Sequence, residues 1–458
     1  MKRIIALLLC LVFALTTLAA CDISTDDSEN DNKAQEENNE NNENNENNEN
    51  NQTNNENNEN GENGGDEVLD DNKEPTLDLT GVTAVRYTSL GEDDSYTVAG
   101  GDKLQSFFEE PIESFYGVCK YYVDNSYDLY SYSVKNGNHF ATFTKSDRYA
   151  HVYWIECEEE LNIIASAKYG KNLPPKEPAV TTGNKKTSVT QIASPEINGM
   201  GYVIRLADGS FIISDGGYEH RVDEIWDTLV TLNGSDKNIV IRAWIMSHSH
   251  GDHAPAYVAF SEKYADKVTL ETFMFCPLSD SDGGSSYNNS MTAATKKFDG
   301  AKILYVHLGM TFKFCNVTME ILATPDDLYI AEPYEGSGKD LIDHNNSSVV
   351  FRITDETGYS AIFLGDFGDT GAYRMIMYFE KYLKSDMCQI SHHGVEDFPL
   401  IAYRQIQASI LFYPCSQSLY NNTGRDADVR KALKNSKYTK EIILHETRQT
   451  REFGLYSE

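Results

Sequence analysis

Met246-Ser247-His248-Ser249-His250-Gly251-Asp252-His253 follows an apolar run that begins at Ile239. Such a run predicts a buried strand, which delivers the polar segment at its carboxyl end. Neutral imidazole nitrogens and a carboxylate are the ligands that zinc-like divalent ions prefer. The i, i+2 spacing points His248 and His250 one way, whereas Asp252 and His253 can serve a neighbouring ion. The segment therefore predicts a site for two metal ions, and the alternative is a polar surface loop that contains histidines by chance.

Around this segment the sequence alternates between strand-like and helix-like patterns from Thr187 onward. This alternation is typical of layered α/β folds. Helices are expected over residues 221–232 and 255–264. Strands are expected as a pair within 201–213, and over 239–246, 268–275, 302–307, 311–322, 347–354, 359–364, 388–391, 410–413 and 441–445.

His248, His250, Asp252 and His253 match in full the HxHxDH motif of the metallo-β-lactamase superfamily, which the chain resembles over roughly residues 187–445. The resemblance implies an α/β fold, the αββα sandwich of that superfamily, in a domain predicted over 187–458. It also implies that these four residues are metal ligands. Two divalent ions would bind, zinc by preference and manganese as the alternative.

Three further motifs follow in the order that the resemblance leads one to expect. Ser214-Asp215-Gly216 is similar to the strand end whose aspartate supports the histidine loop from behind. Leu364-Gly365-Asp366 is similar to the motif whose aspartate bridges the two ions. His392-His393-Gly394 resembles the last metal-binding histidine, with His393 as the expected ligand and His392 behind it.

One position departs from the superfamily pattern. Leu322-Ala323-Thr324-Pro325 has Ala323 where another metal-binding histidine is usual. The first ion then receives only His248, His250 and Asp366 from the protein, unless His344 or Asp326 substitutes. Water or substrate would complete the shell.

The expected chemistry is hydrolysis by a hydroxide shared between the two ions, whose pKa falls to near 7. Asp366 would hold the pair of ions together, and Asp252 would orient the hydroxide or accept its proton. Asn345 to Phe351, followed by Gly-Asp and His-His-Gly, resembles the branch with the ComEC-type competence-protein hydrolase domain and the pneumococcal phosphorylcholine esterase. This resemblance favours a phosphoester or phosphodiester as substrate.

Two other functions compete with this one. The first is acyl hydrolysis of a lactam, lactone or thioester in the same site. The second is a non-catalytic binding lipoprotein with a degenerate metal site, which Ala323 makes conceivable. Retention of the other expected ligands argues against decay, because buried clustered polar groups are costly to keep.

The first residues have the pattern of an export signal. Lys2 and Arg3 precede an apolar run that is too short to span a bilayer, and Leu18-Ala19-Ala20-Cys21 resembles the bacterial lipobox. We expect a signal peptide over residues 1–21, lipidation of Cys21 and anchoring to the outer face of the cytoplasmic membrane. An ordinary secretory peptide that leaves Cys21 free is the alternative. The substrate would then be a small molecule or a cell-envelope component.

Residues 22–75 are rich in Asn and Glu and hold 19 acidic residues against Lys33 and Lys73. With almost no apolar surface to bury, such a segment is expected to be a disordered tether. The net charge of the whole chain is −32. Because no long basic block exists to release counterions from phosphates, binding to long nucleic acid is not expected.

Residues 76–180 are rich in tyrosine and in short alternating runs such as His151 to Ile155, which predict a small mixed or strand-rich module. The tyrosines are expected to pack its core, and a carbohydrate-binding surface is the alternative. Cys119 and Cys157 form either a disulfide or two buried thiols. No cysteine pair has the spacing of a metal knuckle.

Overall fold

A computed structural model describes residues 75–168, 170–176, 183–277, 287–326, 345–395, 398–424 and 426–456. The predicted signal peptide, Cys21, most of the tether and His344 lie outside these residues. Residues 70–458 form one compact unit. In the described ranges, every helix is too short or too polar to cross a membrane.

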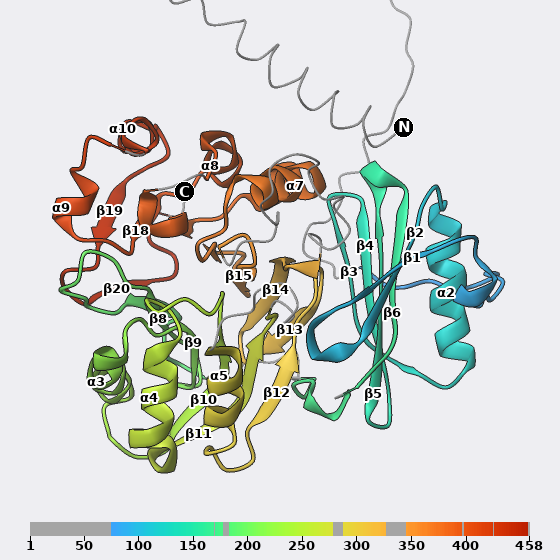
Figure 1. Cartoon of the computed structure of the whole chain (residues 1–458), viewed down its shortest axis with the longest axis horizontal. Coiled ribbons are helices and arrows are strands. Elements are labelled where there is room, and N and C mark those ends of the chain that lie inside the picture. Colours follow the sequence, from blue (N-terminus) through green and yellow to red (C-terminus); the bar gives the residue numbers. More distant parts are fainter. Residues whose placement is uncertain are drawn as a thin grey trace, which may run out of the picture. The chain divides into compact units, whose positions relative to one another are not determined.

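The first part of the described chain is a six-stranded antiparallel sheet with one helix (Figure 1). The spatial order of its strands is β1-β2-β6-β5-β4-β3. Their bounds are β1 (Asp94–Thr97), β2 (Lys103–Phe107), β3 (Asp128–Lys135), β4 (Asn138–Lys145), β5 (Arg148–Ile155) and β6 (Glu160–Lys168). Helix α2 (Ile112–Asp124) packs on β5 and β6. The N-terminal module is therefore strand-rich, as predicted.

Tyrosines contribute to the core of this N-terminal sheet. Tyr122 of α2 is buried and stacks on Phe143 of β4, with ring centroids 5.6 Å apart. Tyr149 and Tyr153 of β5 are also buried. For these three residues the packing role that the sequence favours is confirmed.

A second sheet follows, of mixed direction, in the order β12-β11-β10-β9-β8-β7-β20. The four strands from β12 to β9 are parallel, and the others are antiparallel to their neighbours. Their bounds are β7 (Ser188–Gln191), β8 (Gly201–Arg205), β9 (Phe211–Asp215), β10 (Ile239–Ile245), β11 (Val268–Phe275), β12 (Lys302–Tyr305) and β20 (Gln449–Glu452). Helices α3 (Val222–Asn233), α4 (Pro255–Tyr264) and α5 (Tyr287–Thr295) accompany this sheet.

The third sheet has the order β13-β14-β15-β16-β17-β18-β19, antiparallel up to β16 and parallel from there. Its strands are β13 (Thr311–Phe314), β14 (Val317–Ala323), β15 (Val350–Asp355), β16 (Ser360–Phe363), β17 (Met387–Gln389), β18 (Ile410–Tyr413) and β19 (Glu441–Leu444). Its helices are α7 (Asp369–Phe379), α8 (Leu400–Ile406), α9 (Gln417–Tyr420) and α10 (Ala427–Lys434). Short 3₁₀ turns cover Tyr87–Ser89, Ala99–Gly101, Glu156–Glu158, Gly170–Asn172, Glu219–Arg221, Ala265–Lys267, Glu380–Leu383 and Ser391–Gly394.

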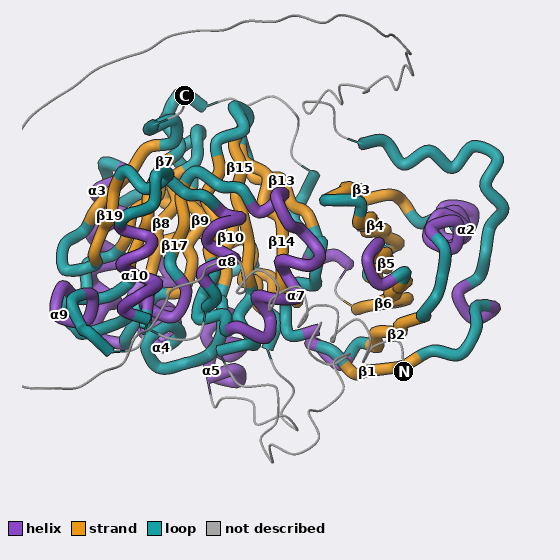
Figure 2. Tube along the Cα trace, turned by 90° about the horizontal axis from the view of Figure 1, so that it is seen from above, coloured by secondary structure: helices purple, strands orange, loops and turns teal. Residues whose placement is uncertain are grey.

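The alternation of side chains along the strands shows how the two seven-stranded sheets are layered. Ala243 and Ile245 of β10 join the core shared with β14, β15 and β16 of the other sheet, whereas Trp244 points to the core under α3, α4 and α5. Each sheet therefore buries one face against the other and the opposite face against helices. Strands lie at the centre of this part of the chain with helices outside them (Figure 2). This αββα arrangement confirms the predicted fold class.

The N-terminal sheet is joined to the sandwich by buried polar contacts. Lys135 at the end of β3 has no exposed side-chain surface, and its Nζ donates to the carbonyl of Gly309 at 3.0 Å. Asn138 Nδ2 donates to the carbonyl of Tyr378 at 2.6 Å. The ring of His151 in β5 contacts the carbonyl of Leu308 through Nε2 at 2.7 Å. These contacts make one continuous packed body of the two parts.

Two details differ from the sequence-based expectation. Residues 311–322 were predicted as one strand, but they form the hairpin of β13 and β14, because the backbone turns at Cys315 with a φ of 52°. The six described cysteines form no disulfide. Cys119 is a buried thiol, as one alternative had it, whereas Cys157 is exposed.

Candidate metal centre

The predicted ligands come from neighbouring strand ends of the two facing sheets. Strands β9 and β10 are parallel neighbours. Strand β9 ends at Asp215, and β10 ends just before the segment that starts at Ser247. In the other sheet, β16 and β17 are parallel neighbours that lead to Asp366 and His393. Because parallel strands end at one edge of a sheet, each sheet places its polar residues at a single edge.

The structure brings the six predicted metal ligands together in two sets. One set is His248, His250 and Asp366, and the other is Asp252, His253, Asp366 and His393. Within each set the potential ligand atoms lie within 4.8 Å of one another. Asp366 belongs to both sets, which is the geometry expected of a residue that bridges two ions. These buried His and Asp clusters are consistent with binding of divalent metal ions.

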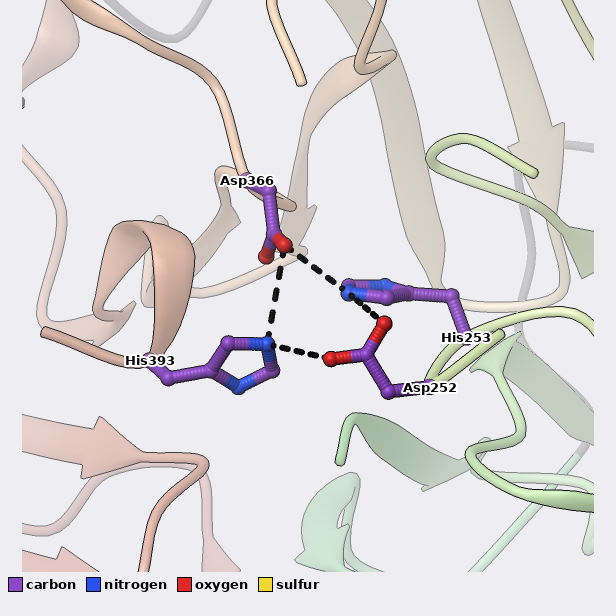
Figure 3. Close-up of side chains that lie close together, drawn as sticks. All are labelled: Asp252, His253, Asp366 and His393. Carbon is purple, nitrogen blue, oxygen red and sulfur yellow. Dashed lines mark ion pairs between the residues drawn. The ribbon is translucent and has the colours of Figure 1, made fainter. Parts of the chain in front are cut away.

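Asp366 Oδ2 lies at the centre of the cluster. It is 3.1 Å from Nε2 of His253, 3.5 Å from Nε2 of His393 and 3.7 Å from Nε2 of His248. The close-up shows the side chains of Asp252, His253, Asp366 and His393 pointing toward one another (Figure 3). Asp252 contacts His393 from the other side, with 3.0 Å between Oδ2 and Nε2.

The ring nitrogens and the carboxylate oxygen that face the centre of this cluster lie close together but form no hydrogen bonds of proper geometry with one another. Among the described residues, no hydrogen-bond partner with proper geometry faces Nε2 of His248, His253 or His393, or Oδ1 of Asp366. The short contact between His253 and Asp366 is thus misaligned for an N–H···O bond. Buried polar atoms are rarely left in this state, because each costs free energy. A divalent cation would satisfy these lone pairs, so the residues present fit such an ion.

Each of the three buried histidines is held at the opposite ring nitrogen. Nδ1 of His253 lies 3.1 Å from Asp215 Oδ2, and Nδ1 of His393 lies 2.9 Å from the carbonyl of Pro414. Nδ1 of His248 lies near the hydroxyls of Ser247 and Ser348. Metal-binding histidines are typically oriented in this way, since a bond at one nitrogen fixes the tautomer that leaves the other free for the ion.

Asp215, which the sequence places behind the histidine segment, contacts that segment through Ser247. Its Oδ1 accepts the backbone N–H of Ser247 at 2.7 Å, and its Oδ2 accepts the Ser247 hydroxyl at 2.8 Å. The side chain is fully buried, and its backbone φ is 53°. A non-glycine residue in this region is strained by about 1 to 3 kcal/mol, and such strain clusters at functional sites.

His392 lies beside the cluster and outside both sets of candidate ligands. Its Nε2 is 3.8 Å from Asp366 Oδ2, and 18% of its side chain is exposed, against 2% for His393. The structure therefore places His393, rather than His392, among the converging groups. Asp326, the proposed substitute for the missing histidine, lies instead against His307 and Cys276.

The charges of the cluster are mutually dependent. Burial alone would raise the pKa of Asp366, but His253 and His393 hold it well below its usual range. Burial lowers the pKa of His248, and the charge of His253 lowers it further. For His393 burial lowers the pKa, but Asp366 and Asp252 together outweigh burial and raise the pKa to about 9. The carboxylates of Asp366 and Asp252 thus hold protons on imidazoles, at a place where a cation can replace those protons.

Several supporting residues carry no recognisable signal in the sequence. Asn198 Nδ2 donates to Asp252 Oδ2 at 2.6 Å, and the hydroxyl of Tyr218 donates to Asn198 Oδ1 at 2.9 Å. Gln389 Oε1 accepts the backbone N–H groups of Leu364 and Gly365, which fixes the turn before Asp366. Only Ser247 could have been suspected, because it directly precedes the first histidine.

No protein-family model matches the sequence, and no curated protein matches it. Solved structures of metallo-β-lactamase-fold proteins are distantly similar. YhfI from Bacillus subtilis is 13% identical over 58% of this chain and 99% of its own, with a TM-score of 0.37. Zn²⁺-bound PqqB from Methylobacterium extorquens is 8% identical over 58% of this chain and 99% of its own, with a TM-score of 0.36. A diphosphatase of the PhnP family is 10% identical over 60% of this chain and 100% of its own, with a TM-score of 0.32. Similarities at this level assign no activity to the chain.

Proposed function

We propose that this protein is a metal-dependent hydrolase that binds two divalent cations, zinc in preference to manganese. The observation that carries the proposal is the convergence of buried imidazole and carboxylate atoms without hydrogen-bond partners among the described residues, with Asp366 common to both sets. His248, His250 and Asp366 would hold one ion. Asp252, His253, Asp366 and His393 would hold the other.

The two cations, when bound, would lower the pKa of water and take up negative charge that develops on the substrate. The residues of the chain have separate tasks around them. Asp366, with 2% of its side chain exposed, is the buried anion at the centre. Asp252 is more open, with 14% exposed, and is the carboxylate that can accept a proton at Oδ2. Asn198 holds that oxygen in place through its hydrogen bond.

A phosphoester or phosphodiester is the proposed substrate class. The support is the resemblance of the Asn345 to Phe351 stretch and the motifs after it to the branch that contains phosphoesterases. Ala323 adds to this support, because an alanine supplies no ligand and leaves the first ion open to a substrate oxygen. Two ions that share a carboxylate suit an in-line displacement, in which the attacking and the leaving oxygen both need positive charge.

We also propose that the mature protein is lipid-anchored through Cys21 on the outer face of the cytoplasmic membrane. The Leu18-Ala19-Ala20-Cys21 segment supports this placement. The Asn- and Glu-rich residues 22–75 would then separate the enzyme from the bilayer by a solvated tether. A substrate in the cell envelope, or a small molecule outside the cell, would be accessible to it.

The decisive experiment combines a substrate panel with metal removal and return. The purified full chain is assayed with bis-p-nitrophenyl phosphate, p-nitrophenylphosphorylcholine and nitrocefin, first after chelation and then with added zinc or manganese. Phosphoester turnover that needs metal and disappears in Asp366→Asn supports the proposal. The exposed carboxylate Asp227 provides the matched control, since Asp227→Asn should retain full activity.

Each remaining outcome has a definite meaning. Turnover of nitrocefin alone would replace the phosphoesterase assignment with acyl hydrolysis. The metal content of the wild type and of Asp366→Asn, measured by mass spectrometry, shows whether the His and Asp cluster binds metal. A chain that binds no metal at the His and Asp cluster after zinc reconstitution would be a binding protein with a degenerate site.

A further inference from the structure

A second cluster of metal-ligating side chains lies outside the residues used so far. It consists of Cys276, His307 and Asp326, whose potential ligand atoms lie within 4.8 Å of one another. Cys276 directly follows β11, His307 follows β12, and Asp326 follows β14. Because β11 and β12 are parallel neighbours, their carboxyl ends place the thiol and the imidazole at one edge of the sheet.

All three side chains are buried. The exposed fractions are 3% for Cys276, 0% for His307 and 1% for Asp326. His307 Nδ1 and Asp326 Oδ2 are 2.5 Å apart, and Cys276 Sγ lies 3.7 Å from Asp326 Oδ1. Three such groups of different chemistry rarely gather in a protein interior for packing alone, because each must be desolvated.

The orientation of His307 is the one that a metal ligand requires. Its Nδ1 faces the carboxylate and the thiol, and its Nε2 lies 2.9 Å from the hydroxyl of Tyr149 in β5. A histidine that binds metal through one nitrogen is typically fixed by a hydrogen bond at the other. Tyr149 is fully buried and provides that hydrogen bond from the N-terminal sheet.

We propose that Cys276, His307 and Asp326 form a zinc site that is separate from the catalytic centre. A tetrahedral zinc ion with bonds of about 2.0 to 2.3 Å separates its ligand atoms by roughly 3.4 to 3.6 Å. The pair of Cys276 and Asp326 already has nearly this spacing. His307 and Asp326 have to move apart by about 1 Å, as the proton between them is replaced by the ion.

The charges of such a site balance. Binding releases the thiol proton of Cys276 to solvent and moves the imidazole proton of His307 from Nδ1 to Nε2, where the hydroxyl oxygen of Tyr149 accepts it, so a thiolate, a carboxylate and a neutral imidazole face Zn²⁺. The sum is zero, which is the condition under which ions are least costly to bury. A thiolate also makes this set softer than the His and Asp cluster, and thiolate ligands favour zinc over magnesium or manganese.

A small cavity borders Cys276. Its volume is about 10 Å³, and its lining includes Cys276, Pro277, His248 and Ser249 but neither His307 nor Asp326. A space of this size holds about one water molecule. The proposed site therefore lies next to the catalytic centre and shares no ligand with it.

Cobalt substitution tests the proposal without any activity measurement. Co²⁺ shows intense near-ultraviolet charge-transfer absorption when a thiolate is a ligand, and the catalytic set contains no cysteine. We use the full chain with Cys21→Ser, stripped of metal and reconstituted with Co²⁺. The absorption should be present, should be lost in Cys276→Ser and in Asp326→Asn, and should persist in Cys157→Ser, which alters the exposed thiol.

The same spectra separate this proposal from the proposed function. Asp366→Asn should keep the thiolate absorption while it abolishes hydrolysis. Loss of the absorption in Asp366→Asn would overturn the separate site. So would its absence from the Cys21→Ser chain, or its survival when Cys276→Ser is added; neither result would affect the assignment of the His and Asp cluster.

Discussion

Asp215 Oδ2 lies 3.1 Å from Nδ1 of His253, and neither side chain is exposed to solvent. The contact fixes the tautomer in which Nδ1 carries the proton and Nε2 faces Asp366. The same carboxylate accepts two hydrogen bonds from Ser247, which directly precedes the first histidine of the segment. One buried side chain thus sets both the backbone and the ring geometry of the candidate ligands.

Replacing this carboxylate should weaken metal binding without removing a ligand. For Asp215→Asn we expect a 10- to 100-fold lower affinity for zinc, the typical effect of losing a residue that orients a ligand. Competition with a chromogenic chelator measures the affinity. Asp227→Asn, on the exposed face of α3, should bind zinc as the wild type does. Equal affinities of both variants would contradict the orienting role of Asp215.

The shared position of Asp366 makes a prediction about stoichiometry. Asp366→Asn should lower the bound metal by about two equivalents relative to wild type, because both sets lose a ligand. His250→Ala should lower it by about one, since His250 belongs to one set. Mass spectrometry of metal-reconstituted protein gives the numbers. Equal losses in the two variants would argue against a bridging Asp366.

Gly365 should tolerate no side chain. Its φ is 59°, and an added Cβ would lie 2.7 Å from Cβ of Ser247 and 2.9 Å from Oγ of Ser348. Gly358, in the hairpin of β15 and β16, has a φ of 85° with nothing within 4 Å of an added Cβ. We expect Gly358→Ala to cost about 1 to 2 kcal/mol in free energy of unfolding, and Gly365→Ala roughly 1 to 3 kcal/mol more. Urea denaturation compares the two, and similar losses would show that the close approach to Ser247 relaxes freely.

His151 should make the protein less stable in acid. Burial lowers its pKa to about 3, from 6.5 in the unfolded chain. Between these values the unfolded chain binds a proton that the native chain does not, so the free energy of unfolding falls as pH falls, by up to about 1.4 kcal/mol per unit. Urea denaturation of chelated protein between pH 6.5 and 5 should show a steeper decline for wild type than for His151→Gln. Parallel declines would refute this assignment.

The anchoring proposal is tested by fractionation. Cys21→Ser removes the thiol that would carry the lipid. The wild-type chain should pellet with membranes and require detergent for release, whereas the variant should be soluble after export. Membrane association that is unchanged in Cys21→Ser would indicate another mode of attachment.

The sequence predicted those site residues that belong to a short motif or directly follow an apolar strand. His248, His250, Asp252 and His253 lie on one loop, and Asp366 and His393 each follow an apolar strand, so their meeting at sheet edges could be expected. Asn198 could not be foreseen, because it lies 54 positions before Asp252 in the sequence and meets it only in the folded chain.

The unforeseen parts of the fold have similar causes. Strands β7 and β20 pair over more than 250 positions, and neither has a strong pattern of its own. The hairpin at Cys315 lacks the glycine that usually marks a positive φ. Cys276, His307 and Asp326 have no motif spacing at all, because three separate strand ends bring them together.

The buried ammonium of Lys135 links the stability of the N-terminal sheet to that of the sandwich. Its hydrogen bonds to Gly309 and Thr311 are made across the boundary between the N-terminal sheet and the sandwich. Separating the two parts would leave Gly309 without this donor and expose apolar side chains such as Phe312. We expect the two parts to melt in a single calorimetric transition, so that truncation before residue 183 yields an aggregating fragment rather than a smaller enzyme.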